Sequence, residues 1–570
     1  MEQVRRYISK TGYPAAVVFC FALLFLCIPI TYGINDDMTM RDIASGVVSG
    51  MPDGHLVYIQ YALGRPLSFL FQAWKGIDWY ALFFLTVMLL CFGLTAYRLC
   101  ALWKEKGAGK WLCLFFSAAF FILVYLRYFV SFQYTITASV TGGTAAFFYF
   151  TLDPEKRTGR RLGEYAIVLA LLWLTYCIRP QVFWMAAPFG GILFLYKKGV
   201  RTAEKGLLFF LALLGLLGIF LVEQNAYSSQ EWKDFRKFNL ARQDIFDYYG
   251  VPGYEENRDF YRSVGMEECD VVNLERYNLY LIDGIEDGKL EKTAAYAKRL
   301  WEEAQTWEQK LKAGVRLAVK AFASPESLLL NAAGKLLLLL GILRAFRRRE
   351  GLGLLAALTV VEVLLWLYLG YRGRLPDRVG SSLLMLSFSC VLANCCDSAR
   401  KEGRRSFFVP GPAAAAVGIL ILALCGGCLV TVRREQMEEV RRNQEFEVFQ
   451  DWFAKRSENV YFYPTAFLGG YTENVRLFRA FKPANSFLLG GWLSFSPVEL
   501  GGMERFGIIE VDKALIEKDN IYLVMTNASS RVDEHYRQKQ LEITWEEADR
   551  VPAFQTEVPV WKLQAEGEGA

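Results

Sequence analysis

The run GLLFFLALLGLLGIFLVE, residues 206–223, has no charged side chain before its last residue. A helix needs about 20 mostly apolar residues to cross roughly 30 Å of hydrocarbon. Similar runs lie at 14–34, 79–101, 111–130, 134–152, 162–178, 182–196, 325–343, 351–370, 379–396 and 407–431. Of the 570 residues, 53% are hydrophobic and 15% aromatic, and the mean hydropathy is +0.20. We therefore expect a polytopic α-helical membrane protein with about eleven transmembrane helices.

Basic residues indicate how these helices are oriented. They gather in the N-terminus and in alternate connections, at 104–110, 156–161, 197–205, 344–349 and 400–405. The positive-inside rule assigns these segments to the cytoplasm, so we expect a multi-pass protein of the cytoplasmic membrane with a cytoplasmic N-terminus. No small-residue cleavage site ends the first run, which favours a retained helix. The net charge of +5 is spread over these connections, so a nucleic-acid partner is not expected.

Three polar segments fall on the opposite, extracytoplasmic side: the first loop (35–78), the long loop (225–324) and the C-terminal part (432–570). The apolar residues of the long loop recur at helical spacing, which predicts surface helices. The C-terminal part begins with a helical pattern at 433–456. It continues with strand-like runs, NVYFYPT, NIYLVMTN and VPVWKLQ. This alternation predicts a small extracytoplasmic α/β domain.

Asp36 and Asp37 lie just beyond the first apolar run. Adjacent carboxylates at a low-dielectric boundary repel each other, which raises one pKa and favours a base or a cation site. Alternatively, Asn35 to Asp37 cap a helix over 38–49, whose N-terminus attracts negative charge. The two interpretations are compatible, with one carboxylate capping and the other facing a cleft, and Asp37 is slightly favoured as the chemical group.

Other residues on the extracytoplasmic side could bind a substrate. Asp53 and His55 lie in a turn, PDGH, and the chain has only two histidines. Arginine suits phosphate oxygens, and the candidates are Arg179 and the group Arg372, Arg374 and Arg378. Trp492, in a Gly-Gly-Trp sequence, could stack on a sugar. The alternatives are structural packing for His55 and Trp492, and membrane-interface anchoring for the arginines.

The layout of the chain resembles the GT-C superfamily of membrane glycosyltransferases. The resemblance rests on a first membrane helix, a following loop that opens with Asp36 and Asp37 and continues as surface helices, and six further spans before another long loop. It covers residues 1–224 as a seven-helix module. The long loop, four further transmembrane helices at 325–431 and the domain at 432–570 then follow.

The resemblance implies a sugar donor carried on polyprenyl phosphate or diphosphate. One of the two aspartates would act as general base on an acceptor hydroxyl, and the arginines would stabilise the leaving phosphate. The acidic pattern of the oligosaccharyltransferase branch is missing, which favours a cell-envelope glycan, polymer or lipid as acceptor. Dependence on a divalent cation, Mg²⁺ or Mn²⁺, stays open because two carboxylates offer few oxygens.

Two functions of other classes remain as alternatives. One is a transporter or flippase for a lipid-linked or envelope precursor, for which Glu362 is the only acidic residue deep in an apolar run. The other is a noncatalytic envelope scaffold that binds a partner through its C-terminal domain. The enzyme hypothesis requires Asp36, Asp37 and the arginine group to share a cavity, because a donor bound at one group must reach the other.

Overall fold

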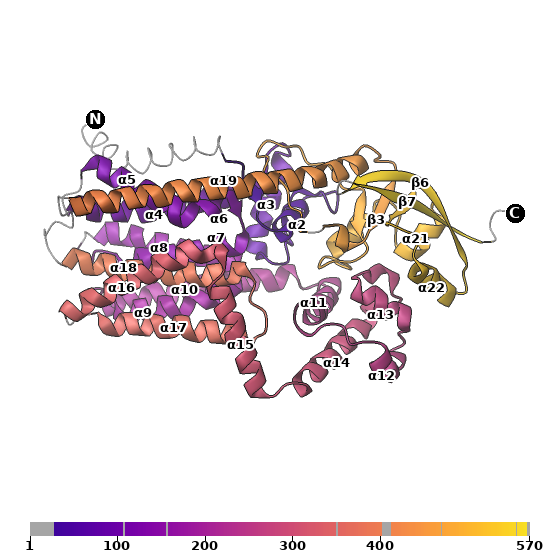
Figure 1. Cartoon of the computed structure of the whole chain (residues 1–570), viewed down its shortest axis with the longest axis horizontal. Helices are drawn as coiled ribbons and strands as arrows, with labels where there is room; N and C mark the ends of the chain where they lie inside the picture. The colour runs from indigo at the N-terminus through magenta and orange to yellow at the C-terminus, as the bar shows by residue number, and fades with distance from the viewer. Residues whose placement is uncertain are drawn as a thin grey trace.

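The computed structural model describes residues 28–105, 109–155, 158–348, 351–401, 412–468, 470–553 and 556–566. Most of these residues are helical. A bundle of long helices forms one end of the molecule, and a mixed region of short helices and a sheet forms the other (Figure 1). The bundle end that adjoins the mixed region is called the polar end below, and the opposite one the far end.

Among the described residues, eight helical stretches are long and apolar enough to cross a membrane. They lie in α4 (Trp79–Glu105), α5 with η1 and α6 (Lys110–Phe120, Phe121–Tyr125 and Leu126–Val130), α8 (Thr158–Ile178), α10 (Thr202–Ala226), α16 (Leu328–Arg348), α17 (Leu352–Tyr371), α18 (Asp377–Lys401) and α19 (Pro412–Ala454). Two further predicted spans are the shorter helices α7 (Tyr134–Phe150) and α9 (Pro180–Tyr196). Of the predicted span 14–34, residues 14–27 lie outside the described residues, as do residues 407–411 of the last one.

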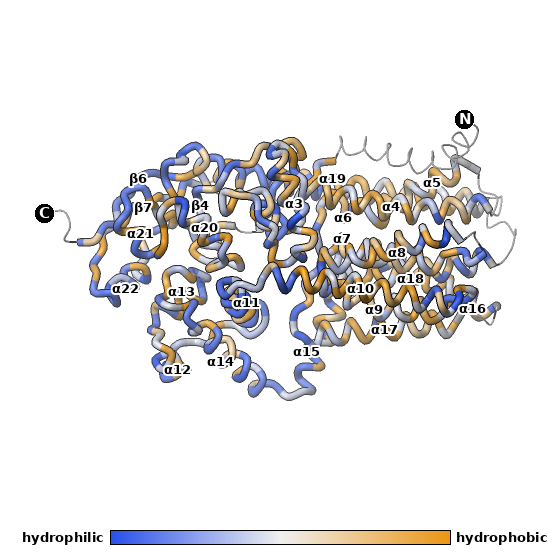
Figure 2. The backbone as a smooth tube through the Cα atoms, turned by 180° about the vertical axis from the view of Figure 1, so that it is seen from behind, coloured by the Kyte–Doolittle hydropathy of each residue, from blue (hydrophilic) through white to orange (hydrophobic). Residues whose placement is uncertain are grey.

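The surface of the bundle is compatible with insertion into a membrane. Phe209, Phe210, Leu213 and Leu217 of α10 each expose about half or more of their surface. A soluble monomer rarely exposes so large a contiguous apolar patch, whereas lipid tails accommodate it. Figure 2 shows the same distribution, with hydrophobic residues predominating along the bundle helices.

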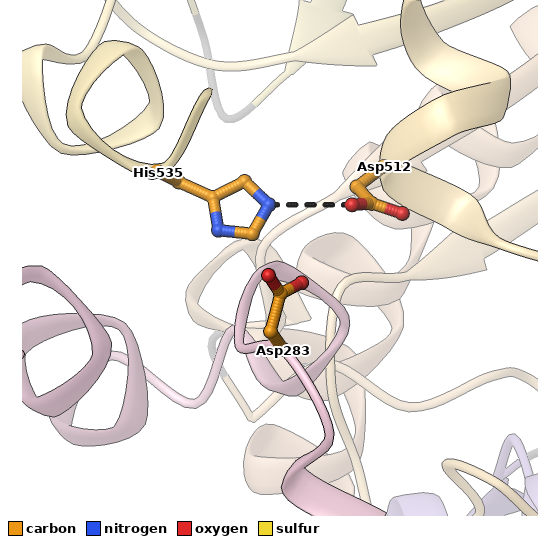
Figure 3. Close-up of side chains that lie close together, drawn as sticks. All are labelled: Asp283, Asp512 and His535. Atoms are coloured by element: carbon orange, nitrogen blue, oxygen red, sulfur yellow. Dashed lines mark ion pairs between the residues drawn. The ribbon is translucent and has the colours of Figure 1, made fainter. Parts of the chain in front are cut away.

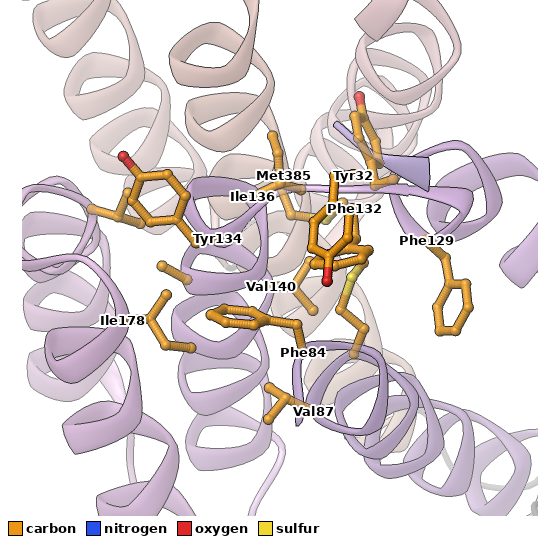
Figure 4. Close-up of a cluster of buried hydrophobic side chains, with 14 of the residues drawn as sticks. Tyr32, Phe84, Val87, Phe129, Phe132, Tyr134, Ile136, Val140, Ile178 and Met385 are labelled. Atoms are coloured by element: carbon orange, nitrogen blue, oxygen red, sulfur yellow. The ribbon is translucent and has the colours of Figure 1, made fainter. Parts of the chain in front are cut away.

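Helix α7 forms the centre of the bundle. All of its residues except Ala146 are buried, and it packs against α4, α8, α9 and α18. Its side chains join a continuous apolar core that extends to the polar end. Figure 4 shows part of this core, where Phe84 of α4, Ile178 of α8 and Met385 of α18 surround Ile136 and Val140. A central helix that is apolar on every side is expected in such a core.

Basic residues of three of the predicted connections lie together. Lys197, Lys198, Arg344 and Arg400 line one cavity of about 1060 Å³ at the far end. Their placement on one side agrees with the alternation read from the sequence. Several basic residues of these connections, such as Lys156 and Arg404, and those of the N-terminus lie outside the described residues.

The C-terminal region contains a five-stranded sheet of order β4-β3-β5-β7-β6. The strands are β3 (Val460–Tyr463), β4 (Ser486–Leu488), β5 (Ile521–Val524), β6 (Ile543–Ala553) and β7 (Thr556–Ala565). β3 pairs in parallel with β4 and β5, whereas β7 pairs antiparallel with β5 and β6. The three predicted strands are β3, β5 and β7, so the expectation of a small sheet in this region is confirmed.

The side chains of β3 point alternately to the two faces of the sheet, and both faces are covered. Val460 and Phe462 face a core shared with α20 (Pro497–Glu504), α21 (Val511–Glu517) and α22 (Ser530–Gln538). Tyr461 and Tyr463 face the other way and pack on Phe453 of α19. Successive side chains of a strand point to opposite faces, so a strand covered on both sides is apolar throughout.

Helix α19 differs from the expectation. The sequence predicts a span that ends at residue 431 and a separate helix over 433–456, but the structure has one continuous helix, Pro412–Ala454. Its second half leaves the bundle and packs on the sheet (Figure 1). The sequence between the two predicted helices has no glycine or proline to interrupt the helix. One rigid element therefore connects the bundle to the C-terminal domain, which is the region 432–570.

The long loop is helical, as its periodicity predicts. It contains α11 (Gln230–Gln243), η2 (Asp244–Tyr249), α12 (Arg258–Ser263), α13 (Glu268–Glu275), α14 (Leu290–Glu303) and α15 (Trp307–Phe322). These elements have an apolar core of their own, which includes Phe238, Tyr261 and Leu274. Two residues of the loop, Tyr280 and Leu281, are buried in the core of the C-terminal domain. The long loop and the C-terminal domain are therefore packed together at the polar end.

Candidate functional site

A short backbone pairing fixes the position of the two aspartates. β1 (Thr31–Tyr32) pairs in parallel with β2 (Ser131–Phe132), and the Gly33 N–H donates to the Phe132 carbonyl at 2.8 Å. A Cβ at Gly33 would lie 2.5 Å from Gln133 Cγ, so only glycine fits this approach. The helix α2 (Asn35–Ser45) begins two residues later. The aspartates are thereby held against the end of the central helix α7.

Asp36 and Asp37 lie in the first turn of α2, which begins three residues before the predicted start of the helix at residue 38. Negative charge is favourable there because it opposes the helix dipole. However, the residue at the N-cap is Ile34, and no side chain caps the helix by a hydrogen bond. The capping interpretation therefore holds for the position of the charges and not for a hydrogen bond.

Asp37 is completely buried. Its Oδ1 accepts hydrogen bonds from the Tyr80 hydroxyl at 2.6 Å and from the Tyr134 N–H at 3.2 Å. Burial raises the pKa of Asp37 to about 8, because the charged form loses its hydration. At neutral pH this carboxyl is therefore mostly protonated, and it packs into the bundle.

Asp36 faces a cavity of about 360 Å³ at the polar end. Burial raises the pKa of Asp36, and Arg378, Arg179 and Arg242 act in the opposite direction. The cavity is enclosed by three parts of the chain. The first loop supplies Asp36 and Tyr58, the long loop Arg242, Asp247 and Tyr277, and the C-terminal domain Thr465, Ser486, Trp492 and Glu499. The bundle helices and the ends of their connections add Tyr134, Arg179, Arg374 and Arg378 to the wall.

Four arginines line this cavity. Arg378 Nη2 lies 3.6 Å from Asp36 Oδ2, and Arg374 forms an ion pair with Asp247. Arg242 donates to the Tyr277 hydroxyl at 3.0 Å, and Arg179 lies over the Tyr58 ring at 5.2 Å. The carboxylates Asp42 and Glu473, which also line the cavity, pair with Arg41 outside it. The Asp36 side of the cavity thus has more positive than negative charge, which suits an anionic ligand.

Aromatic rings line the same cavity. Trp492 lies against Tyr58 with ring centroids 4.7 Å apart, and Tyr58 stacks on Tyr134 at 6.4 Å. A half-buried indole beside polar groups can pack against the apolar face of a sugar while hydroxyls bond to the neighbouring polar groups. The arrangement offers an acidic group, positive charge and an aromatic surface within one space.

Five of the nine predicted site residues line this cavity: Asp36, Arg179, Arg374, Arg378 and Trp492. The structure thus brings Asp36 within 3.6 Å of Arg378, which meets the requirement of a shared cavity for Asp36 and two of the three grouped arginines. Asp37 is packed behind Asp36, in the core of the bundle. Asp53, His55 and Arg372 do not line the cavity.

His55 belongs to a structural contact. Its Nδ1 lies 2.6 Å from Asp53 Oδ1, and its Nε2 lies 3.1 Å from the Ala226 carbonyl. The ring stacks on Trp232, with centroids 4.6 Å apart. His55 and Asp53 therefore connect the first loop to the junction of α10 and α11. Arg372 lies over the ring of Tyr248, with its guanidinium carbon 5.5 Å from the centroid.

Arg242 is a cavity arginine that the sequence analysis missed. It lies in the last turn of α11, on the same buried face as Phe235 and Phe238. The spacing of these three positions is i, i+3 and i+7, so the sequence places an arginine on an otherwise apolar helix face. An arginine on an apolar helix face is the sequence feature that could have identified Arg242 as a site residue. Tyr58, Asp247 and Tyr277 come from separate segments, and no spacing in the sequence connects them.

The two aspartates offer little to a metal ion by themselves. Among the residues that the structure describes, Asp36 and Asp37 belong to no group of three acidic, histidine or cysteine side chains close enough to share an ion. Dependence on a divalent cation at this site stays a prediction.

Comparisons of the chain with protein-family models, with curated proteins and with solved structures find no match.

Proposed function

We propose that the chain is an inverting glycosyltransferase of the GT-C type. It moves a sugar from a polyprenyl-phosphate or diphosphate carrier to a cell-envelope glycan, polymer or lipid. The observation that carries this proposal is the cavity in which the Asp36 carboxylate lies 3.6 Å from the Arg378 guanidinium, with Arg179, Arg242 and Trp492 in the same wall. Transfer of a phosphate-linked sugar needs a carboxylate as base, guanidinium groups for the phosphate and an aromatic ring for the sugar, all in one cavity.

Asp36 is the general base in this proposal. It faces the cavity, and burial raises its pKa toward the working pH, where a base is most effective. Asp37 is unsuitable because it is buried and holds its proton at neutral pH. The slight preference for Asp37 drawn from the sequence is therefore reversed. Asp36 takes the proton of an acceptor hydroxyl, and the oxygen attacks the anomeric carbon from the face opposite the phosphate.

The arginines hold the phosphate of the donor. Guanidinium groups bind phosphate oxygens in pairs, and in a cavity shielded from water they stabilise the charge that develops on the leaving group. Arg378 has a second role, because it pairs with Asp36 when no donor is present. A bound phosphate competes for Arg378, and the weaker pairing makes Asp36 a stronger base.

The proposal places the polar end at the extracytoplasmic face of the cytoplasmic membrane, with the N-terminus in the cytoplasm and about eleven spans. The basic residues that gather at the far end support this orientation. Envelope polymers and their lipid carriers are present at that face, which is why an envelope acceptor is preferred.

Separate substitutions Asp36→Asn and Asp37→Asn test the proposal. In a strain that lacks the chain, the extracted lipids are compared for accumulated polyprenyl-linked sugar after complementation with each variant. Asp36→Asn should abolish complementation, since a lost general base reduces the rate by about 10²–10⁴. Asp37→Asn and the exposed control Asp234→Asn should complement.

Full complementation by Asp36→Asn would refute the assignment of the base. If deletion changes no polyprenyl-linked sugar, and proteoliposomes with the protein move such a lipid in response to a proton gradient, the transporter alternative replaces the enzyme.

A further inference from the structure

A second cluster of polar side chains lies away from the cavity, where the long loop meets the C-terminal domain. Asp283 of the long loop approaches Asp512 of α21 and His535 of α22 (Figure 3). One donor atom from each residue lies within 4.8 Å of the other two. Among the described residues, this is the group of acidic, histidine and cysteine side chains whose geometry suits a shared ion.

The imidazole of His535 is the second observation. Its side chain is 1% exposed, and neither ring nitrogen has a hydrogen-bond partner within the described residues. The Nε2 atom points at Asp512, with the Oδ2 atom 3.5 Å away. A buried imidazole whose ring nitrogens make no hydrogen bond is costly, and such groups in native structures call for an explanation.

Lys539 balances only part of the negative charge of the cluster and does not satisfy the imidazole of His535. Its ammonium pairs with Asp283 at 2.6 Å and also with Asp512. One positive charge balances one of the two carboxylates, and an ammonium has only N–H donors, so it cannot accept a hydrogen bond from the imidazole N–H. A divalent ion would balance both carboxylates and bind the imidazole nitrogen. Lys539 is 22% exposed and has a flexible side chain that can turn to solvent.

We propose that Asp283, Asp512 and His535 form a site for a divalent first-row transition ion, Zn²⁺ or Mn²⁺, that competes with the Lys539 ammonium. Imidazole with carboxylates is a donor set that these ions accept, and water would fill the remaining positions. Metal–ligand bonds of about 2.0–2.2 Å require the three donors to move closer together. Asp283 supplies this movement, because its side chain is 58% exposed.

The position of the site indicates a structural role. The segment around Asp283 is already joined to the C-terminal domain, because the Tyr280 N–H donates to the Leu489 carbonyl at 3.0 Å. Tyr277 of the long loop and Trp492 of the C-terminal domain each supply part of the cavity wall. An ion at this junction would therefore fix these two parts of the wall relative to each other.

Metal uptake by the whole, tag-free protein in detergent tests this proposal. After chelator treatment, equilibrium dialysis against Zn²⁺ should give one bound ion per chain. His535→Gln and Asp512→Asn should weaken binding by about tenfold or more, as for other changes that disturb metal coordination. The matched control is His55→Gln, which removes the only other histidine of the chain and should bind as the wild type does.

Lys539→Met removes the competing charge and should bind Zn²⁺ roughly tenfold more tightly. In the wild type, Zn²⁺ should also slow hydrogen exchange over 279–289 and α22, and it should have no such effect in His535→Gln. Equal uptake by the wild type and His535→Gln would overturn the site. So would the absence of uptake in all variants, or uptake by Lys539→Met alone, because the ammonium would then be the native occupant.

Discussion

The buried carboxyl of Asp37 gives the sharpest test of the structure. Replacing it with asparagine keeps the size of the side chain, and the amide oxygen can still accept from Tyr80 and Tyr134. The substitution removes the ability to ionise and replaces the second carboxyl oxygen with an amide N–H₂ group. We expect Asp37→Asn to be tolerated, and its effect on the free energy of unfolding to depend on pH.

The magnitude follows from the pKa. An aspartate in the unfolded chain loses its proton near 3.8, whereas folded Asp37 keeps it up to about 8. Between these values the folded state binds more protons, so the stability of the wild type falls as pH rises, by about 1.4 kcal/mol per unit. At pH 7 the accumulated cost is on the order of 4 kcal/mol, and it levels off above pH 8.

Asparagine avoids this cost but introduces an amide N–H₂ group into a buried position, at roughly 1–3 kcal/mol. Asp37→Asn should therefore be about as stable as the wild type, or less stable, at pH 5, and more stable at pH 8. Thermal unfolding in detergent at the two pH values measures the difference. The exposed control Asp234→Asn should show no gain at pH 8. An effect of Asp37→Asn that is equal at both pH values would show that Asp37 does not hold its proton, and would refute this reasoning.

Three further predictions concern the site and its surroundings. Arg378→Gln removes a charge that lowers the pKa of Asp36, so the acid limb of the pH–rate profile should move to higher pH. An acid limb at the same pH as in the wild type would show that the rate does not depend on the ionisation of Asp36. His55→Ala should lower the stability by about 1–3 kcal/mol and leave the donor KM unchanged, because His55 lies outside the cavity. Gly370→Ala would place a Cβ 2.2 Å from the Gly314 carbonyl oxygen, where α15 meets α17, and should cost about 1–3 kcal/mol in thermal unfolding. Gly218→Ala in α10 meets open space and should not destabilise the protein, because alanine favours a helix interior over glycine.

The helices and strands were largely predictable because each has a local cause. The described residues of the predicted spans are mostly helical, although residues 28–34 of the first span are not, and short apolar and aromatic runs marked β3, β5 and β7. The break expected near residue 431 failed for a local reason as well. The change from apolar to charged composition there marks a change of surroundings, from bundle to sheet, and a helix continues through such a change unless a breaker residue stops it.

The site was predictable only in part. Asp36 could be found because it follows a span, and Arg374 and Arg378 because arginine is unexpected in that connection. The positions of Asp247 and Tyr277 in the cavity depend on how the long loop folds over the bundle, which is a tertiary event without a local pattern. His55 shows the opposite error. Its rarity suggested a function, whereas its contacts with Trp232 and Ala226 give it a packing role.

The adjacency of Asp36 and Asp37 has a geometric consequence. Successive residues of an α-helix point about 100° apart, so two neighbouring carboxylates in one turn cannot face the same surface. At the start of α2 one direction leads into the arginine-lined cavity and the other into the core around Tyr80 and Tyr134. If both groups were charged, two buried negative charges would repel each other across one turn. Because Asp37 stays protonated, it adds a neutral hydrogen-bonding anchor that fixes the turn, and Asp36 is the one that can carry charge into the cavity.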